Sequence, residues 1–457
     1  MEPEYEYDQD AERYNEMLPP PLGGEHEEEF LSLQASFARR RRRLVMEVVH
    51  RCCGGLDVHK ESVTAGVVWA EENGKKRREE RTYGTFTRDL LRMSDWLRTC
   101  GVTHVAMEST GVYWKPVWHV LEGQFELLLV NAQQVKAIPG RKTDRGDAAR
   151  LAELLQHGLV RSSFVPPEPI RELRDLTRYR VNLAHECNRI ANRVQKVLED
   201  ANLKLASVAT DPLGASGRAM LKAIIAGEDD ATELAEMARG LLRRKIPQLQ
   251  QALQGRVSDH HRFLLGELME HLEFVESKMT RLEEEIATRL HPFEETVERL
   301  CTVPGIDRIS AWGILSEVGL DMRQFPDAGH LASWAGLCPG NWQSAGKRQS
   351  GRIRKGNAWL RRHLCQSAWA VSTKQKNYVS ALFRRIAGRR GVKRATIAVA
   401  HALLVIVYHI LKRGVVYHEL GADHFDKLNP QRSKRKLVKR LEALGFRVTL
   451  ETASQPT

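Results

Sequence analysis

The sequence predicts an α/β domain, a long helical region and a mostly helical, basic C-terminal domain. Three observations lead to this prediction. Apolar segments of strand length alternate with amphipathic helical segments between residues 45 and 165. Two heptad patterns follow within residues 166–295. Finally, the 91 residues between Asp327 and Glu419 contain 17 Lys or Arg and no Asp or Glu.

The first 44 residues are expected to form a disordered acidic tail that ends in a run of arginines. Met1 to Phe30 contain eleven Asp or Glu and one Arg, a local charge of about −10. Because the whole chain has a net charge of +12, the remainder carries about +22. The five arginines at 39–43 fit a solvated linker, a phosphate-binding arm or a docking site for the acidic tail.

The basic body favours a polyanionic partner, and nucleic acid is the commonest one. The seven cysteines are scattered without a CxxC pair or a zinc spacing, so we expect reduced thiols in a cytoplasm. The N-terminus lacks the layout of a signal peptide. The apolar run at 395–411 is slightly short for a membrane span and contains polar residues, which favours a buried helix and no membrane.

Strands and helices alternate through residues 45–165. Strands are expected at 48–57, 63–69, 82–87, 104–107 and 126–130. Helices are expected at 88–100, 112–121 and 144–157. Three adjacent strands followed by alternating helices and strands is the order of an RNase H-like mixed sheet.

Four carboxylates occupy the strand ends and the last helix start of this segment. Asp57 and Glu108 lie at or near strand ends, whereas Asp144 and Asp147 lie three residues apart where a helix begins. Each has a simpler explanation: Asp144 and Asp147 as helix-start residues, Asp57 in a turn, and Glu108 at the surface. If the strands are neighbours, however, all four meet at one sheet edge, where they repel one another unless cations bind.

Carboxylate oxygens are ligands that suit Mg²⁺ or Mn²⁺. Two such ions can activate an oxygen nucleophile and stabilise charge on phosphorus during phosphodiester cleavage. On a basic chain, the four carboxylates together therefore predict a metal-dependent nuclease centre.

Two long helices are predicted from apolar residues at alternating spacings of three and four. The first series comprises Leu173, Leu176, Leu183, Cys187, Ile190, Val194, Val197 and Ala201. The second comprises Leu265, Leu268, Leu272, Val275, Met279, Leu282 and Ile286. Such seams form a coiled coil, either as an antiparallel hairpin in one chain or between chains.

Residues 300–319 predict a helix, a tight turn and a second helix. The turn at Val303-Pro304-Gly305 resembles a helix-hairpin-helix, which presents backbone N–H groups to a phosphate. Asp307 stands where the second glycine of that motif is usual. A DNA contact and a purely structural hairpin are equally compatible with this pattern.

A basic, glycine-rich loop with two serines follows Pro339. Ser344 or Ser350 could donate a hydrogen bond to phosphate or attack it, and composition alone favours binding. We expect nucleic-acid contacts from Lys347, Arg348, Arg352, Arg354, Lys355, Asn357, Arg361 and Arg362. Tryptophans interleaved with these charges suit stacking on bases or sugars.

These motifs resemble the DEDD transposases of bacterial insertion sequences, whose better-studied members are bridge-RNA-guided serine recombinases. Matching N-terminal motifs are Gly55-Leu-Asp57-Val-His-Lys60, Met107-Glu108-Ser-Thr-Gly, Asn131-Ala-Gln-Gln-Val-Lys136 and Lys142-Thr-Asp144-Arg-Gly-Asp147. Matching C-terminal motifs are Val303-Pro-Gly305, Ala332-Ser-Trp-Ala-Gly336-Leu-Cys-Pro339 and Ile353-Arg-Lys-Gly-Asn357. The likeness runs from about residue 50 to 415.

The resemblance implies a RuvC-like catalytic domain at 45–165 and a coiled-coil region at 166–295. It implies a transposase domain at 296–420, before a basic extension at 421–457. Asp57, Glu108, Asp144 and Asp147 are then the metal ligands, and Ser344 is the nucleophile, with Ser350 as second choice because Gln343-Ser344-Ala345 replaces the usual Ser-Ser-Gly. A homo-oligomer, from dimer to tetramer, is also implied.

The resulting hypothesis is a DNA transposase that excises and inserts its own element, with donor and target DNA specified by a structured guide RNA. Two alternatives are kept. One is a junction-resolving or RNA-processing nuclease that uses water, and the other is a nucleic-acid-binding protein without catalysis.

Overall fold

The computed structural model describes residues 48–70, 76–109, 111–131, 135, 146–339, 342–344, 347–350, 352–372, 376–428 and 430–451. The chain divides into two compact units between Phe164 and Val165. Each has its own apolar core and is described by itself. The acidic tail, the five arginines and Asp144 lie outside the described residues.

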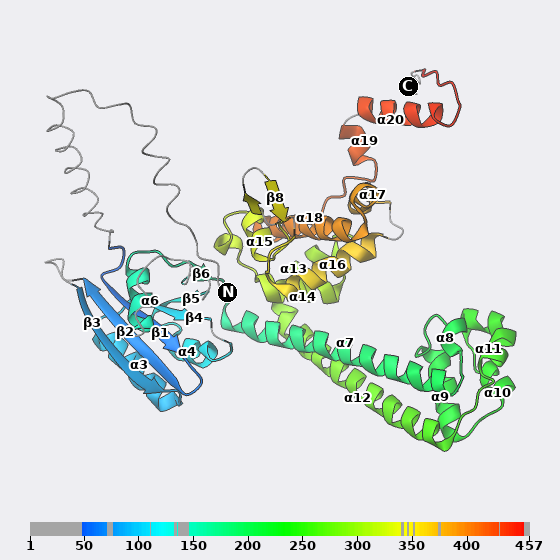
Figure 1. Ribbon diagram of the computed structural model, residues 1–457, viewed down its shortest axis with the longest axis horizontal. Coiled ribbons are helices and arrows are strands. Elements are labelled where there is room, and N and C mark those ends of the chain that lie inside the picture. The colour runs from blue at the N-terminus through cyan, green and yellow to red at the C-terminus, as the bar shows by residue number, and fades with distance from the viewer. Residues whose placement is uncertain are drawn as a thin grey trace, which may run out of the picture. The chain divides into compact units, whose positions relative to one another are not determined.

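The first unit is built on a mixed sheet with the strand order β3-β2-β1-β4-β5-β6 among the described residues (Figure 1). The strands are β1 Cys52–Val58, β2 Ser62–Ala70, β3 Lys76–Gly84, β4 His104–Glu108, β5 Glu126–Val130 and β6 Ser162–Ser163. β1, β2 and β3 are antiparallel neighbours, whereas β1, β4 and β5 run parallel. The carboxyl ends of β1, β4 and β5 therefore share one sheet edge.

Helices cover both faces of this sheet. They are α3 Thr87–Thr99, α4 Trp114–Leu121 and α6 Asp147–Gln156. A Cβ atom on Gly54 would lie 3.4 Å from Leu97 of α3, whereas a Cβ atom on Gly55 would lie 2.1 Å from the carbonyl oxygen of Ala148 in α6. Adjacent residues of a strand point to opposite faces, so α3 and α6 lie on opposite sides of β1.

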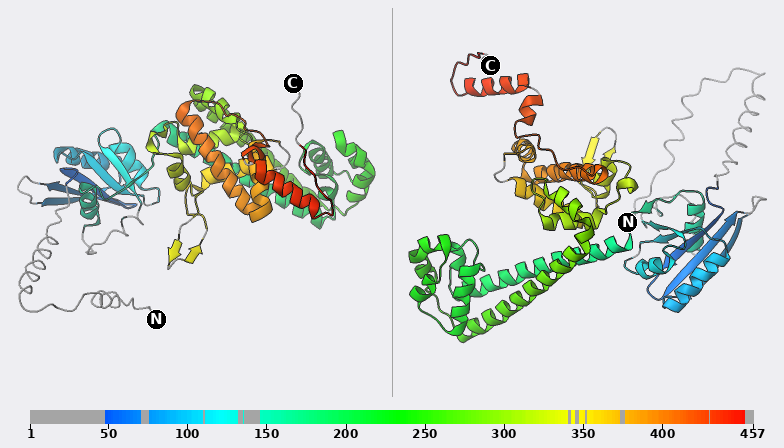
Figure 2. Two further views of the ribbon diagram at one scale, coloured as in Figure 1. Left: turned by 90° about the horizontal axis from the view of Figure 1, so that it is seen from above. Right: turned by 180° about the vertical axis from the view of Figure 1, so that it is seen from behind.

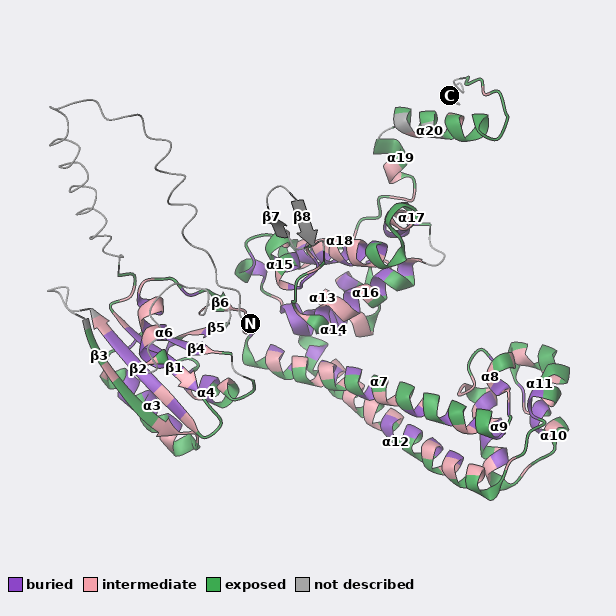
Figure 3. Cartoon of the chain, in the orientation of Figure 1, coloured by how far each residue is buried: buried purple, intermediate pink, exposed green. Residues whose placement is uncertain are grey.

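The third strand corrects one sequence prediction. A strand was expected at 82–87, but β3 spans Lys76–Gly84. Its first six residues are all charged, so a search for apolar segments of strand length misses them. Such a sequence can form a strand here because β3 is an edge strand that pairs with β2 alone and stays largely exposed (Figure 3). Charged residues on an edge also discourage pairing with other chains.

Two long helices of the second unit, α7 Glu168–Asp200 and α12 Asp259–Leu290, lie side by side (Figure 2). Their direction is antiparallel, as shown by the ion pairs Arg289 with Glu172, Arg180 with Glu283 and His261 with Asp200. Most residues of both predicted seams are buried or half-buried, including Ile190, Val194, Leu265 and Leu272. The two apolar seams therefore pack against each other within one chain.

The segment between these helices forms a small helical cap. Its elements are α8 Leu205–Val208, α9 Ala215–Ala226, α10 Ala231–Glu236, the 3₁₀ helix η1 Gly240–Lys245 and α11 Ile246–Ala252. Met220, Leu221 and Leu249 of the cap belong to the same apolar cluster as Ile190 and Leu265 of the long pair. The cap therefore covers the apolar end of the pair.

The next helices along the chain form a bundle around α18. They are α13 Glu294–Cys301, α14 Arg308–Val318, α15 Ala328–Trp334, α16 Ala358–Ser372, α17 Tyr378–Arg390 and α18 Val392–Arg413. Short elements between them are η2 His291–Phe293, η3 Met322–Gln324, β7 Trp342–Ser344 and β8 Lys347–Ser350. α18 is apolar and long enough to cross a membrane, but α13, α15, α16 and α17 pack on it, which supports the predicted buried helix.

The turn between α13 and α14 is packed inside this bundle. Gly305 has φ +85°, and a Cβ atom there would lie 2.2 Å from Val371 and 2.5 Å from the Ser367 carbonyl oxygen of α16. Asp307 caps α14 by accepting a hydrogen bond from the Ser310 N–H at 2.7 Å. The hairpin was interpreted either as a DNA contact or as a purely structural turn, and the structural interpretation accounts for these contacts.

The C-terminal extension contains α19 His424–Leu428 and α20 Pro430–Glu442. α20 is rich in lysine and arginine and largely exposed (Figure 3). The seven cysteines of the chain are free, as the sequence predicts.

Candidate active site

Asp57 and Glu108 occupy equivalent positions on neighbouring strands. The parallel register of β1 and β4 ends with the pair Leu56 and Met107, and the two carboxylates come next on their strands. Asp57 shares the face of Gly55, which α6 covers, and Glu108 shares that of Ala106, which packs with Leu151 and Leu155 of α6. Since neighbouring strands lie about 4.8 Å apart, the pleat places both carboxylates side by side on the α6 face.

Asp57 remains accessible at this sheet edge. Its side chain is 32% exposed, and its Oδ2 lies 3.1 Å from Nε2 of His59, which is itself 64% exposed. The His59 N–H donates to the Ser62 carbonyl oxygen in the turn that joins β1 to β2. His59 therefore lies in an exposed turn. The Asp57 carboxylate can contact His59 and solvent at the same time.

Asp147 is the first residue of α6 and is exposed. Close backbone packing fixes this helix, since a Cβ atom on Gly66 of β2 would lie 2.6 Å from the Ala149 nitrogen. Gly146 precedes the helix with φ +102°, a conformation that favours glycine. The sequence pattern thus correctly begins a helix near Asp147, although its predicted start at 144 lies outside the described residues.

Glu80 of β3 contacts the start of α6, a link that the sequence did not reveal. Its Oε1 accepts a hydrogen bond from the Ala149 N–H at 3.3 Å, in the first turn of α6. A carboxylate there satisfies an otherwise unpaired helix donor and interacts favourably with the helix dipole. Because the expected third strand began at residue 82, no local pattern linked Glu80 to α6.

The described residues contain no group of three or more His, Cys, Asp or Glu side chains arranged to hold a metal ion. The structure therefore brings Asp57 and Glu108 to neighbouring positions and places Asp147 at the helix start, and Asp144 lies outside the described residues. The four predicted ligands remain a prediction.

The serine loop of the second unit is a two-stranded hairpin. Ser344 of β7 pairs with Lys347 of β8, and Ser350 pairs with Trp342. The side chains of these strands, Arg348 included, lie outside the described residues. A bridge between Pro339 and Ile353 closes the base of the hairpin. The backbone of the loop is thus defined at both ends.

Two glycines hold that base. A Cβ atom on Gly356 would lie 2.4 Å from the Gly336 nitrogen, and Gly336 has φ +71°. The two backbone segments touch directly, and no side chain fits between them. Beyond the base, Arg352, Arg354 and Lys355 are exposed. These three predicted nucleic-acid contacts therefore lie at the surface, where a phosphate can reach them.

Asn357, Arg361 and Arg362 are partly buried instead. Asn357 Oδ1 caps α16 by accepting from the N–H groups of Trp359 at 3.0 Å and Leu360 at 3.1 Å. Arg362 contacts His185 of α7, and burial lowers the pKa of Arg362. Asn357 and Arg362 thus hold α16 in place, and their predicted contacts with nucleic acid remain predictions.

Glu317 lies at the centre of an ion-pair network that the sequence did not reveal. It is 1% exposed. Arg178 of α7 donates to it in a fork, Nε to Oε1 at 2.7 Å and Nη2 to Oε2 at 2.8 Å. Arg174 Nη2 donates to the Glu317 carbonyl oxygen at 2.7 Å. Burial lowers the pKa of Arg174 to about 10, and Glu317 opposes this shift.

Comparisons with known proteins agree with these features. The family model for the DEDD domain of IS110-type proteins, described as "Transposase", matches residues 54–203, which include Asp57, Glu108 and Asp147. A second model, described as "Transposase IS116/IS110/IS902 family", matches residues 297–384, which include Glu317, the serine hairpin and α16. Both models describe transposases, so the class of protein is a DNA-processing enzyme.

Three relatives place the chain more closely. It is 28% identical to a "Probable family 20 transposase" of Pseudomonas aeruginosa, over 71% of this chain and 88% of that protein. It is 26% identical to the "Transposase for insertion sequence element IS1111A" of Coxiella burnetii, over 63% of this chain and 72% of that protein. An IS110 protein of Streptomyces coelicolor is 28% identical, over 61% and 73%. The chain belongs to the IS110 family of transposases.

Proposed function

We propose that this chain excises and inserts an insertion sequence by metal-dependent DNA cleavage with Ser344 as the nucleophile. The observation that carries the proposal is the placement of Asp57 and Glu108 at neighbouring strand ends, on the face that α6 covers. The strand order β3-β2-β1-β4-β5 is the one expected of an RNase H-like fold. This order supports a RuvC-like catalytic domain.

The donor set fits a hard divalent cation. Asp57, Glu108, Asp144 and Asp147 would hold Mg²⁺ or Mn²⁺ through carboxylate oxygens. Adjacent carboxylates repel each other, which a bound cation relieves, and the exposed fraction of Asp57 leaves it open to solvent. When bound, such an ion supplies positive charge next to a scissile phosphate.

The proposed reaction is an exchange of phosphate esters. Ser344 Oγ attacks phosphorus, its proton passes to solvent, and a new ester joins serine to DNA. The P–O bond to the neighbouring deoxyribose breaks, and the departing oxygen takes up a proton. A hydroxyl group of another strand then attacks the phosphoserine, and Ser344 regains its proton. No energy source is needed, because each broken ester is replaced by another.

Nucleic acid is held by its backbone in this proposal. Arg352, Arg354 and Lys355 are exposed next to the hairpin and suit phosphate contacts. A structured guide RNA would select donor and target DNA by base pairing, so protein contacts to phosphate suffice. The α7 and α12 seams of each chain are proposed as a coiled coil within that chain, and the active protein as a dimer or tetramer. In this assembly, the carboxylates of one subunit act with Ser344 of another. The proposed location is a bacterial cytoplasm.

The test traps the intermediate. Full-length protein, its copurifying RNA and Mg²⁺ are incubated with a suicide DNA substrate, and the products are separated under denaturing conditions. We expect a covalent protein–DNA band that Ser344→Ala removes and Ser350→Ala retains. Asp57→Asn and Glu108→Gln are expected to lower its yield by orders of magnitude, since each removes a charged ligand.

Other outcomes identify the alternatives. A band that survives Ser344→Ala excludes this nucleophile. Cleaved DNA without a covalent band indicates a nuclease that uses water, and intact DNA under every condition indicates a binding protein. Sequencing the RNA that copurifies with the protein tests the guide: it should contain segments complementary to donor and target DNA.

A further inference from the structure

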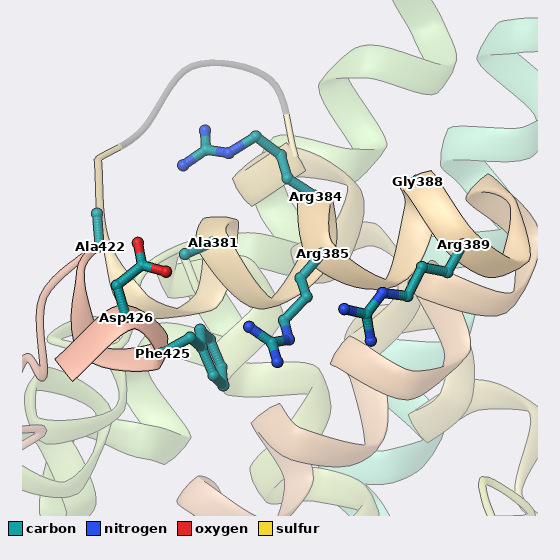
Figure 4. Close-up of a pocket in the computed structure, with 8 residues that line it drawn as sticks. All are labelled: Ala381, Arg384, Arg385, Gly388, Arg389, Ala422, Phe425 and Asp426. Atoms are coloured by element: carbon teal, nitrogen blue, oxygen red, sulfur yellow. The ribbon is translucent and has the colours of Figure 1, made fainter. Parts of the chain in front are cut away.

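A second basic site lies on α17, apart from the serine hairpin in the fold. A cavity of about 420 Å³ opens between α17 and the start of the C-terminal extension (Figure 4). It is lined by Ala381, Arg384, Arg385, Gly388, Arg389, Ala422, Phe425 and Asp426. Three guanidinium groups therefore share it with a single carboxylate.

The aromatic ring of Phe425 orients one of these arginines. The Arg385 guanidinium lies 5.2 Å from the centre of the Phe425 ring. Phe425 in turn stacks on Tyr378 of α17, with 5.2 Å between ring centres and 21° between ring planes. Arg389 lies one helical turn after Arg385, and Figure 4 shows both side chains extending from the same side of α17.

Stabilisation of the fold explains part of this arrangement. Arg389 is in the last turn of α17, where a positive charge interacts favourably with the helix dipole. The contact of Arg385 with Phe425 helps to hold α19 on α17. Both arginines belong to the segment between Asp327 and Glu419, which contains no acidic residue.

The carboxylate in the cavity is already engaged. Asp426 Oδ1 accepts a hydrogen bond from the Ser433 hydroxyl at 2.9 Å, in the first turn of α20. Against three guanidinium groups its single charge leaves an excess of positive charge. Guanidinium groups bind phosphate through paired N–H donors. A cavity of this volume is also large enough for a small ligand group.

We infer that this cavity binds a backbone phosphate of nucleic acid, at a contact separate from the serine hairpin. Arg385 and Arg389 donate to the phosphate oxygens, and Asp426 weakens the site by repulsion. The inference rests on the proposed nucleic-acid partner. DNA and RNA present the same phosphodiester, and the test separates them.

The test measures binding of the full-length protein to a labelled DNA duplex and to a labelled structured RNA across a salt series. Arg389→Ala is expected to raise Kd about tenfold, as expected for a lost charge-assisted hydrogen bond. It should also lower the slope of log K against log salt by about one. Asp426→Asn removes the repulsion and is expected to lower Kd. The nucleic acid whose Kd changes is the one that the cavity holds.

Arg244→Ala is the matched control, because it removes one exposed arginine from η1 of the same unit. It should change Kd far less than Arg389→Ala does, and the melting temperatures of all variants show that they fold. Equal effects of Arg244→Ala and Arg389→Ala overturn the inference. If Arg354→Ala still weakens binding in that case, the proposed function stands. If the unmodified protein binds neither probe, the proposed function itself fails.

Discussion

The side-chain amide of Asn357 donates a 2.6 Å hydrogen bond to the buried carboxylate of Glu317, 40 residues earlier in the chain. Asn357 directly follows the loop that carries Ser344, and the same carboxylate binds Arg178 of α7. The end of the serine loop is thus fixed to the long helix pair through one buried charge. Changes at Glu317 should therefore affect both stability and the position of the loop.

Replacing Glu317 tests the buried network. Glu317→Ala leaves Arg174 and Arg178 without their carboxylate, and Arg174 is 15% exposed. Breaking a buried pair in this way costs about 3–5 kcal/mol, which chemical denaturation measures. The control is Glu285→Ala, which removes an exposed i,i+4 pair with Arg289 and should cost no more than about 0.5 kcal/mol. Equal losses would contradict the network.

Two substitutions at Asn357 separate its two contacts. Asn357→Ala removes the cap of α16 and the bond to Glu317, and the cap alone contributes about 1 kcal/mol. Asn357→Asp keeps a cap acceptor but places a second carboxylate beside Glu317, where like charges repel. We expect Asn357→Asp to be at least as destabilising as Asn357→Ala, and both to slow formation of the covalent DNA band. A residue that only caps the helix would leave Asn357→Asp at wild-type stability.

Neighbouring glycines of β1 provide a matched pair of variants. A Cβ atom on Gly55 would lie 2.1 Å from the Ala148 carbonyl oxygen and 2.5 Å from the Ala152 nitrogen, whereas one on Gly54 would meet side-chain methyl groups at 3.4 Å. Gly55→Ala must displace α6, and we expect a loss of about 3 kcal/mol or more together with loss of DNA cleavage. Gly54→Ala should change the free energy of unfolding by less than about 1 kcal/mol. Similar melting temperatures would contradict this packing.

Local patterns predicted the features that depend on neighbouring residues in the sequence. The strands ending near Asp57 and Glu108 followed from apolar runs, and the seams of α7 and α12 from their heptads. The fork between Arg178 and Glu317 joins residues 139 apart, and that distance leaves no periodic signal. Charged β3 was misplaced for a related reason, because an edge strand needs no apolar pattern.

The misplaced strand leads to a prediction about Glu80. Its carboxylate accepts from the first turn of α6, next to Asp147. Glu80→Ala should lower the free energy of unfolding by about 1 kcal/mol, and Glu80→Gln by less, since an acceptor oxygen remains. The control is Glu79→Ala on the same strand, which loses exposed ion pairs with Arg77 and Arg81. If Glu79→Ala and Glu80→Ala cost the same, the contact with α6 has no special role.

The acid stability of the second unit should depend on His363. This residue of α16 is 6% exposed and packs against Gly313 of α14. Burial lowers its pKa from 6.5 to about 4. Glu317 opposes that shift, and Arg362 and Arg180 add to it. The unfolded chain therefore binds a proton between these two pH values that the folded chain excludes, and stability must rise with pH over this range.

The stabilisation is complete above pH 6.5 and is lost as the pH falls towards 4. The lowered pKa corresponds to roughly 3 kcal/mol across that interval. Denaturation in a pH series should show this loss in the unmodified protein and a flatter curve for His363→Gln. His260→Gln, at an exposed position of α12, is the control and should keep the wild-type curve. A His363→Gln curve as steep as that of the unmodified protein would assign the acid sensitivity to other groups.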